Sequence, residues 1–279
     1  GAALDTFATE PLQKDSPLRA HPKLIFTPHL GASTTEAQEN VALQVAEQMS
    51  DYLVKGAVSN AINMPSITAE EAPILKPFIR LADVLGAFVG QVTEEPIKEI
   101  EILYDGITAN MNTRALTSAV LAGLIRPQVA DVNMVSAPIM VKEKGVVLSE
   151  VKRDKTGVFD GYIKLTVTTE SMTRSVAGTV FSDGKPRFIQ IKGINLDADV
   201  GSHMIYITNT DVPGMIGFIG TTLGAAGVNI ANFQLGRDKQ GGDAIALLYV
   251  DGEVDDAVLG QLTAHQAIRQ AKLLTFNID

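Results

Sequence analysis

The first strong pattern in the chain is a helical one. Ser33 and Glu36 form a Ser-x-x-Glu capping box, which marks the start of a helix. After the box, apolar residues recur every four positions, as expected for one face of a helix. The pattern predicts a long helix over 34–54. Its apolar face consists of Ala37, Val41, Val45, Met49 and Leu53.

Two further helices and several strands are predicted downstream. A second capping box, Thr68-x-x-Glu71, precedes a helix whose apolar face extends to Val92, and residues 113–125 form a helix that stops before Pro127. Runs with period-two alternation predict strands. These strands lie near 98–102, 146–152, 162–168, 175–181 and 187–192. This middle part is therefore expected to be an α+β domain.

The last part of the chain has a regular order of elements. The pattern predicts strands at 203–209, from 227–230 onward, at 244–250 and at 271–278, with helices at 215–225 and 255–264. This βαββαβ order predicts a ferredoxin-like sandwich. The glycine run from Gly214 to Gly227 lacks the Lys-Ser/Thr ending of a phosphate loop, so we expect it to serve close helix packing.

The start of the chain differs from both of these parts. Residues 1–7 form a short strand, expected to be buried, that runs into a loop, and 23–27 form a second strand before the first helix. We expect three segments: an α/β remnant over 1–64, an α+β domain over 65–201 and the ferredoxin-like unit over 202–279.

Composition narrows the class of protein. The chain has 279 residues, 46% apolar content and no cysteine, so it can bury several cores and has no disulfides. A net charge of −9 argues against a general basic surface for nucleic acid. The four histidines show no metal-ligand spacing, and no apolar run reaches the length of a membrane span. We expect a cytoplasmic protein that binds neither nucleic acid, membrane nor metal.

The candidate chemistry lies around His29, which stands between Pro28 and the first helix. Two strand ends would bring Asp5, Glu10 and His29 to one edge. A carboxylate beside an imidazole orients its tautomer and raises its pKa, as a proton shuttle requires. From the residues alone, His29 is also compatible with a ligand or a packed loop residue. Likewise, Glu10 is compatible with a solvated turn residue and Asp5 with a turn cap.

A resemblance favours catalysis. The strings Leu4-Asp5-Thr6-Phe7, Glu10-Pro11 and Thr27-Pro28-His29-Leu30-Gly31-Ala32-Ser33-Thr34 resemble the NAD-dependent D-2-hydroxyacid dehydrogenase family, within it the long-form branch that oxidises 3-phospho-D-glycerate. The resemblance implies that His29 exchanges the proton of the substrate hydroxyl and that Glu10 is its partner. It also implies NAD as cofactor, with Asp5 at the nicotinamide carboxamide and Gly31 and Ala32 beside the nicotinamide.

Two features of that family are missing from the chain. It has no Gly-x-Gly-x-x-Gly string for the dinucleotide phosphates, and the family's substrate-binding arginine has no counterpart in it. We therefore expect the C-terminal half of a longer enzyme, inactive by itself.

The last segment resembles an ACT domain, a module that pairs side by side and binds amino acids at the seam. Asp211-Val212-Pro213-Gly214 and Gly227-Val228-Asn229-Ile230 match its turn and the following strand. The resemblance implies L-serine as effector, held by Asp211 and Asn229, and self-association as a homodimer or homotetramer. The resemblance also places Asn209 in the serine site, where relatives have His or Tyr. The alternative is that Asp211 only stabilises the turn and Asn229 only adopts a left-handed backbone.

The middle segment contains a basic cluster formed by Lys142, Lys144, Lys152, Arg153 and Lys155. Such clusters are usually solvated. The resemblance also implies an allosteric substrate-binding domain here, which would take an anionic effector.

Two other functions remain open at this stage. The chain is compatible with an amino-acid-binding regulatory module without catalysis, and with a dehydrogenase for another D-2-hydroxyacid.

Overall fold

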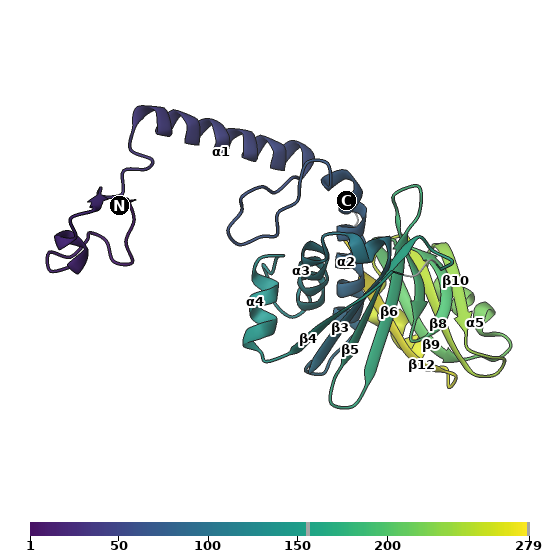
Figure 1. The fold of residues 1–279 in the computed structure, drawn as a ribbon. Coiled ribbons are helices and arrows are strands. Elements are labelled where there is room, and N and C mark those ends of the chain that lie inside the picture. Colours follow the sequence, from purple (N-terminus) through teal and green to yellow (C-terminus); the bar gives the residue numbers. More distant parts are fainter. Residues whose placement is uncertain (155–156, 278–279) are drawn as a thin grey trace.

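The computed structural model describes residues 1–154 and 157–277 (Figure 1). A small N-terminal lobe lies apart from the main body, and a long helix connects the two (Figure 1). In the lobe, β1 (Ala2–Leu4) pairs in parallel with β2 (Leu24–Phe26), and the short helix η1 (Pro17–Ala20) lies between them in sequence. The first strand was expected to be buried, but Ala2 and Ala3 are exposed, because β2 is the only described strand that pairs with it.

The connecting helix α1 (Thr35–Lys55) confirms the predicted helix with a different cap. The cap is Thr34 rather than Ser33, since the Thr34 hydroxyl accepts from the Ala37 N–H at 3.1 Å. Gly56, at φ 73°, ends the helix in the left-handed conformation that favours glycine. No residue of α1 is buried. Its predicted apolar face is therefore exposed to solvent, including Met49 and Leu53.

A six-stranded sheet forms the centre of the body. Its order is β4-β3-β5-β6-β7-β8, and every pair is antiparallel except β3 with β4. The strands are β3 (Glu99–Gly106), β4 (Val147–Arg153), β5 (Gly161–Thr168), β6 (Thr173–Val180), β7 (Pro186–Ile191) and β8 (Ile194–Asp199). The first five match the predicted strands. The pattern missed β8, because half of its residues are Asn or Asp, which are rare in strands.

Three helices and one short helical turn accompany this sheet: α2 (Ala72–Val92), η2 (Ile107–Asn110), α3 (Thr113–Ile125) and α4 (Ser136–Glu143). The second capping box is confirmed, because Thr68 and Glu71 exchange side-chain to backbone hydrogen bonds of 3.0 and 3.2 Å. The sequence pattern missed α4, whose eight residues are too few for a helical period to show.

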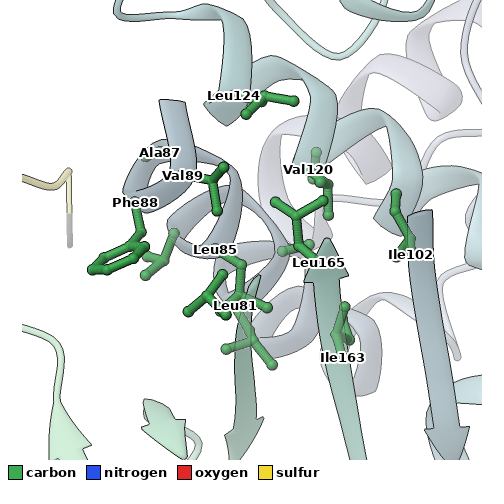
Figure 2. Close-up of a cluster of buried hydrophobic side chains, with 14 of the residues drawn as sticks. Leu81, Leu85, Ala87, Phe88, Val89, Ile102, Val120, Leu124, Ile163 and Leu165 are labelled. Atoms are coloured by element: carbon green, nitrogen blue, oxygen red, sulfur yellow. The ribbon is translucent and has the colours of Figure 1, made fainter. Parts of the chain in front are cut away.

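Helices α2 and α3 pack closely because glycines line their contact. A Cβ on Gly86 would lie 2.1 Å from the Val120 carbonyl oxygen, and one on Gly123 would lie 2.2 Å from the Asp83 carbonyl oxygen. Both contacts involve backbone atoms, so only glycine allows this approach. Leu81, Leu85 and Val120 lie next to this contact, between the helices and strand β5, which carries Ile163 and Leu165 (Figure 2).

The last part of the chain has the predicted βαββαβ order. It comprises β9 (His203–Thr210), α5 (Met215–Ala225), β10 (Ile230–Arg237), β11 (Asp243–Val250), α6 (Asp256–Thr263) and β12 (Ile268–Thr275). Its antiparallel sheet has the order β10-β11-β9-β12. The final strand begins three residues earlier than expected, and Ile278 lies outside the described residues.

The expected role of the glycine run is wrong within this chain. Gly217, Gly220 and Gly224 lie on α5, and an added Cβ at each position would meet nothing within 4 Å. These glycines therefore leave an open helix face instead of a close internal contact. Ile216 on the same helix is 56% exposed.

The two sheets share one core, in which aromatic rings bridge them. Phe88 of α2 contacts Phe188 of β7 and Tyr206 of β9, at centroid distances of 5.3 and 5.2 Å. Phe188 also lies 6.0 Å from Phe276, next to β12. One face of the four-stranded sheet is thus buried against α2, and its other face is buried against α5 and α6.

Within the described ranges, no helix is both long and apolar enough to cross a membrane. The same residues contain no group of three or more His, Asp or Glu side chains that could hold a metal ion.

Candidate active site and effector residues

The loop that carries His29 is fixed by Asp5. The Asp5 carboxylate accepts from the Thr27 hydroxyl at 2.5 Å and from the Leu30 and Gly31 N–H groups at 2.6 and 2.7 Å. These three donors bracket His29, whose φ of 58° is left-handed and rare for a residue with a Cβ. Because β1 and β2 are parallel, their carboxyl ends bring Asp5 and the loop together, as predicted.

Glu10 contacts the histidine from the neighbouring loop. Its Oε2 lies 2.7 Å from His29 Nδ1, and its Oε1 accepts from the Phe7 N–H at 2.9 Å. A carboxylate can only accept, so Nδ1 carries the proton that faces Glu10. In the neutral ring, Nε2 therefore has a free lone pair, and the His29 side chain is 61% exposed. This arrangement can take a proton from a hydroxyl group and hold the resulting charge.

These contacts shift the pKa of each group in the direction that the chemistry requires. The hydrogen bond with Glu10, followed by the charge of Glu10, raises the pKa of His29 above 6.5. The same bond and the Phe7 N–H lower the pKa of Glu10 below its ordinary value. The Thr27 hydroxyl and the Leu30 and Gly31 N–H groups lower the pKa of Asp5. Both carboxyls thus stay ionised while the imidazole titrates.

The residues expected beside the nicotinamide also lie at this loop. A Cβ on Gly31 would lie 3.1 Å from Asp5 Oδ2, so glycine suits this position. Among the described residues, the Gly31 N–H is the one donor to Asp5 Oδ2, which leaves this oxygen capacity for one more donor such as a carboxamide. Gly31 and Ala32 are exposed next to it. The residues present therefore fit a nicotinamide group at this edge.

Sequence reasoning missed Arg19. It lines a cavity of about 460 Å³ together with Glu10, Phe26 and His29. Its guanidinium lies over the Phe26 ring and donates to the Leu12 and Gln13 carbonyls at 2.7 and 2.9 Å. Arg19 therefore ties the loop after Glu10 to β2. No motif marks it, since all its partners are backbone or ring atoms.

Two of the expected effector residues lie at one end of the four-stranded sheet. Asp211, just after β9, binds Arg237 at 2.7 Å and accepts from the Gly241 N–H at 3.2 Å. Arg237 and then that N–H lower the pKa of Asp211. Asn209 is buried, and its Oδ1 has no hydrogen-bond partner among the described residues.

Asn229 lies at the opposite end of that sheet. It precedes β10 and donates to Asp251 at 2.6 Å. Since β10 spans eight residues and ends at Arg237, Asn229 and the Asp211–Arg237 pair are separated by about 26 Å at a strand rise of about 3.3 Å per residue. One chain does not bring the expected effector residues together.

The basic cluster is only partly available for an anion. Arg153 pairs with the buried carboxylate of Asp105 and donates to the Tyr162 hydroxyl at 2.7 Å. Its guanidinium therefore links β4 to the strands β3 and β5. Lys142, Lys144 and Lys152 are exposed. Lys155 lies outside the described residues.

Comparison with known protein families agrees with this geometry. Residues 74–192 match the family described as "D-3-phosphoglycerate dehydrogenase intervening domain". Residues 1–31, which contain Asp5, Glu10 and His29, match the family described as "D-isomer specific 2-hydroxyacid dehydrogenase, NAD binding domain".

Curated relatives match almost the whole chain. The D-3-phosphoglycerate dehydrogenase of Bacillus subtilis is 38% identical over 98% of this chain and 52% of its own length. Those of Synechocystis and Methanocaldococcus jannaschii are 37% and 36% identical over 97% and 94% of this chain, and 49% of their own lengths. The chain spans about half the length of these relatives. Over nearly its whole length it is similar to the C-terminal half of D-3-phosphoglycerate dehydrogenases.

Proposed function

We propose that the whole protein oxidises 3-phospho-D-glycerate to 3-phosphohydroxypyruvate, the first step of L-serine biosynthesis. The observation that carries this proposal is the hydrogen bond of 2.7 Å between Glu10 and His29 in the segment that matches an NAD-binding family. We further propose that residues 1–64 complete the catalytic domains, 65–201 form the allosteric substrate-binding domain and 202–279 form the regulatory domain.

In the proposed reaction, His29 Nε2 takes the proton of the substrate C2 hydroxyl as the C2 hydride leaves. Glu10 accepts a hydrogen bond from Nδ1–H of the imidazolium and stabilises its charge. Asp5 keeps the imidazole in place through the loop that it holds. Bound NAD⁺ supplies the acceptor for the hydride, and Asp5, Gly31 and Ala32 would lie beside its nicotinamide. The proton released to His29 then passes to water.

The proposed regulatory domain is an ACT domain of the ferredoxin-like type. The βαββαβ order, the sheet order β10-β11-β9-β12 and the Asp211-Val212-Pro213-Gly214 turn support this assignment. Its helix α5 has an open glycine face, and the outer edge of β10 has no partner strand among the described residues. An edge strand beside an apolar helix face favours pairing with a second copy.

A two-fold pairing of β10 would assemble the effector site. If the two β10 strands pair antiparallel about Phe233, Asn229 faces the partner's Arg237, which binds the partner's Asp211. Each of the two equivalent sites at this seam then holds one amide and one carboxylate from different chains. These groups suit the hydroxyl and ammonium of L-serine. This pairing explains why residues at opposite ends of one sheet can serve one ligand.

The test of the proposed activity is NADH formation by the whole protein with 3-phospho-D-glycerate, D-glycerate and D-lactate. The proposal requires kcat/KM to be highest for the phosphorylated substrate. Equal or higher values for another D-2-hydroxyacid would make the protein a dehydrogenase of different specificity. Serine binding without NADH formation from any substrate would make it a regulatory module.

A further inference from the structure

A second cavity lies at the seam between the two sheets, away from His29 and from the effector residues. It has a volume of about 860 Å³, which is ample for a small metabolite. Its walls come from the carboxyl ends of α2, α3 and α4, the start of β3 and the strand β12. Two contacts tie the walls together: Gln91 exchanges hydrogen bonds of 2.9 Å with the Thr275 backbone, and Lys272 binds Glu94 at 3.0 Å.

Most of the surface of this cavity is apolar. Its apolar lining comes from both sheets and their helices, and includes Ile97, Ile100, Leu124, Val141 and Leu273. Such a surface favours an apolar group that would otherwise remain in water.

One buried polar group in the lining is unsatisfied. Thr93 is 5% exposed, and its hydroxyl oxygen has no hydrogen-bond partner in the described part of the chain. Leaving such a group unpaired is costly, so its presence at a cavity points to a ligand that supplies the partner. Thr93 caps the carboxyl end of α2, which has no basic residue in its last turn. The negative end of the helix dipole therefore favours a positively charged donor beside Thr93.

The charged side chains of the lining have both signs. Lys272 is paired with Glu94, and Glu95 accepts hydrogen bonds from Ser171 and Thr169. Lys144, on the α4 wall, makes no ion pair among the described residues and is exposed at the cavity. It is therefore free to bind a carboxylate. A simple anion would leave Thr93 and the α2 end without a cation, and a simple cation would leave Lys144 unused.

We propose that this seam cavity binds an α-amino acid with a large apolar side chain. The ammonium group lies at Thr93 and the carboxyl end of α2, the carboxylate at Lys144, and the side chain on the apolar lining. The site is distinct from the proposed serine site, since Asp211 and Asn229 do not line it. Because both sheets contribute walls, the ligand also stabilises their mutual contact.

The test is calorimetric titration of the full chain with L-phenylalanine. Two analogues report on the two charged groups: 2-phenylethylamine lacks the carboxylate, and 3-phenylpropionate lacks the ammonium. We expect both to bind at least about tenfold more weakly than L-phenylalanine, because each loses a charge-assisted hydrogen bond. Absent binding of L-phenylalanine at millimolar concentration, or equal binding of either analogue, would overturn the proposal.

Variants locate the ligand. Lys144→Glu should weaken L-phenylalanine binding at least about tenfold, and Thr93→Val about threefold to tenfold. Lys142→Glu is the matched control, since Lys142 is exposed at the same helix end but does not line the cavity. It should leave affinity unchanged, as should Asp211→Ala. Loss of binding in Asp211→Ala, or full binding in Lys144→Glu, would place the ligand elsewhere and contradict the proposal.

Discussion

Glu10 Oε2 lies 2.7 Å from His29 Nδ1, and Asp5 accepts hydrogen bonds from the backbone of the loop that carries this histidine. The first carboxylate fixes the tautomer of the imidazole, and the second fixes the turn that presents it. Proton transfer and loop geometry thus depend on different acidic residues, and this division leads to separate predictions.

Removing the charge of Glu10 should change the pH dependence of the reaction. Glu10 raises the pKa of His29, and oxidation requires the neutral imidazole. Glu10→Gln should therefore move the acidic limb of kcat/KM for oxidation to lower pH and reduce its plateau about tenfold or more. The pH profile of the whole protein measures both effects, with Glu36→Gln on α1 as control. An unmoved acidic limb would contradict the role of Glu10.

Removing the charge of Asp5 should loosen the loop and should move that limb less than Glu10→Gln does, because the charge of Asp5 contributes less than Glu10 to the raised pKa of His29. In Asp5→Asn, an NH2 group replaces one of the two carboxylate oxygens that accept hydrogen bonds from Thr27, Leu30 and Gly31. The left-handed turn at His29 therefore loses support. We expect kcat to fall about tenfold to a hundredfold, by misplacement of the base. Asp15→Asn, on the exposed loop before η1, is the control. A normal kcat would show that the turn holds without Asp5.

The Glu10–His29 pair also predicts a pH window for the lobe. A lowered carboxyl pKa adds stability above the ordinary value of 4.5, and this is lost as pH falls through the folded-state value. A raised imidazole pKa adds stability below 6.5, and this is lost as pH rises through the folded-state value. Hydrogen exchange of the Phe7 N–H, corrected for its intrinsic rate, should be slowest between pH 4.5 and pH 6.5, where both contributions to stability are fully present. Constant protection from pH 4 to 9 would be inconsistent with the pair.

Mixed assemblies test the proposed effector seam. Asp211→Ala and Asn229→Ala should each abolish serine binding in homodimers. A heterodimer of the two variants retains one of its two sites, with Asn229 from one chain and Asp211 from the other. Random pairing makes about half of the dimers heterodimers, so an equimolar mixture should restore about a quarter of the wild-type stoichiometry. Calorimetry on the refolded mixture measures this value. A mixture without restored sites would show that both residues act within one chain or not at all.

The surroundings of two helical glycines predict opposite effects of their substitution by alanine. Gly86→Ala should lower the free energy of unfolding by about 3 kcal/mol or more, since its Cβ would overlap the backbone of α3. Gly260→Ala, in α6 with nothing within 4 Å of the added Cβ, should raise it by about 0.5–1 kcal/mol. Chemical denaturation measures both. A neutral Gly86→Ala would mean that the helices can separate at little cost.

Local patterns predicted much of this fold because the elements themselves are local. The helices 113–125 and 215–225 have the predicted bounds, since capping, proline and glycine signals lie within a few residues of each end. The βαββαβ order followed in the same way. The cap of α1 was misplaced by one residue, because Ser33 and Thr34 are both good caps and only the structure shows which hydroxyl reaches an N–H.

Long-range relationships could not be read from those patterns. Phe88 fits a helix face in sequence, but its ring contacts Tyr206, which lies more than a hundred residues further along the chain in the other sheet. The identity of Glu10 and His29 as candidates came from a motif, whereas the anchoring of the loop by Asp5 and Arg19 depends on three-dimensional contacts. For the same reason, the sequence suggested one effector site, whereas in a single chain Asp211 and Asn229 lie at opposite ends of the four-stranded sheet.

The central claim is that His29 is the acid and base of an NAD-dependent dehydrogenase. The most direct measurement is the rate of NADH formation from 3-phospho-D-glycerate by the whole protein carrying His29→Asn, with NADH binding followed by fluorescence. The account predicts a fall in kcat of about a hundredfold or more with unchanged NADH affinity. A variant that keeps nearly the wild-type rate would contradict it.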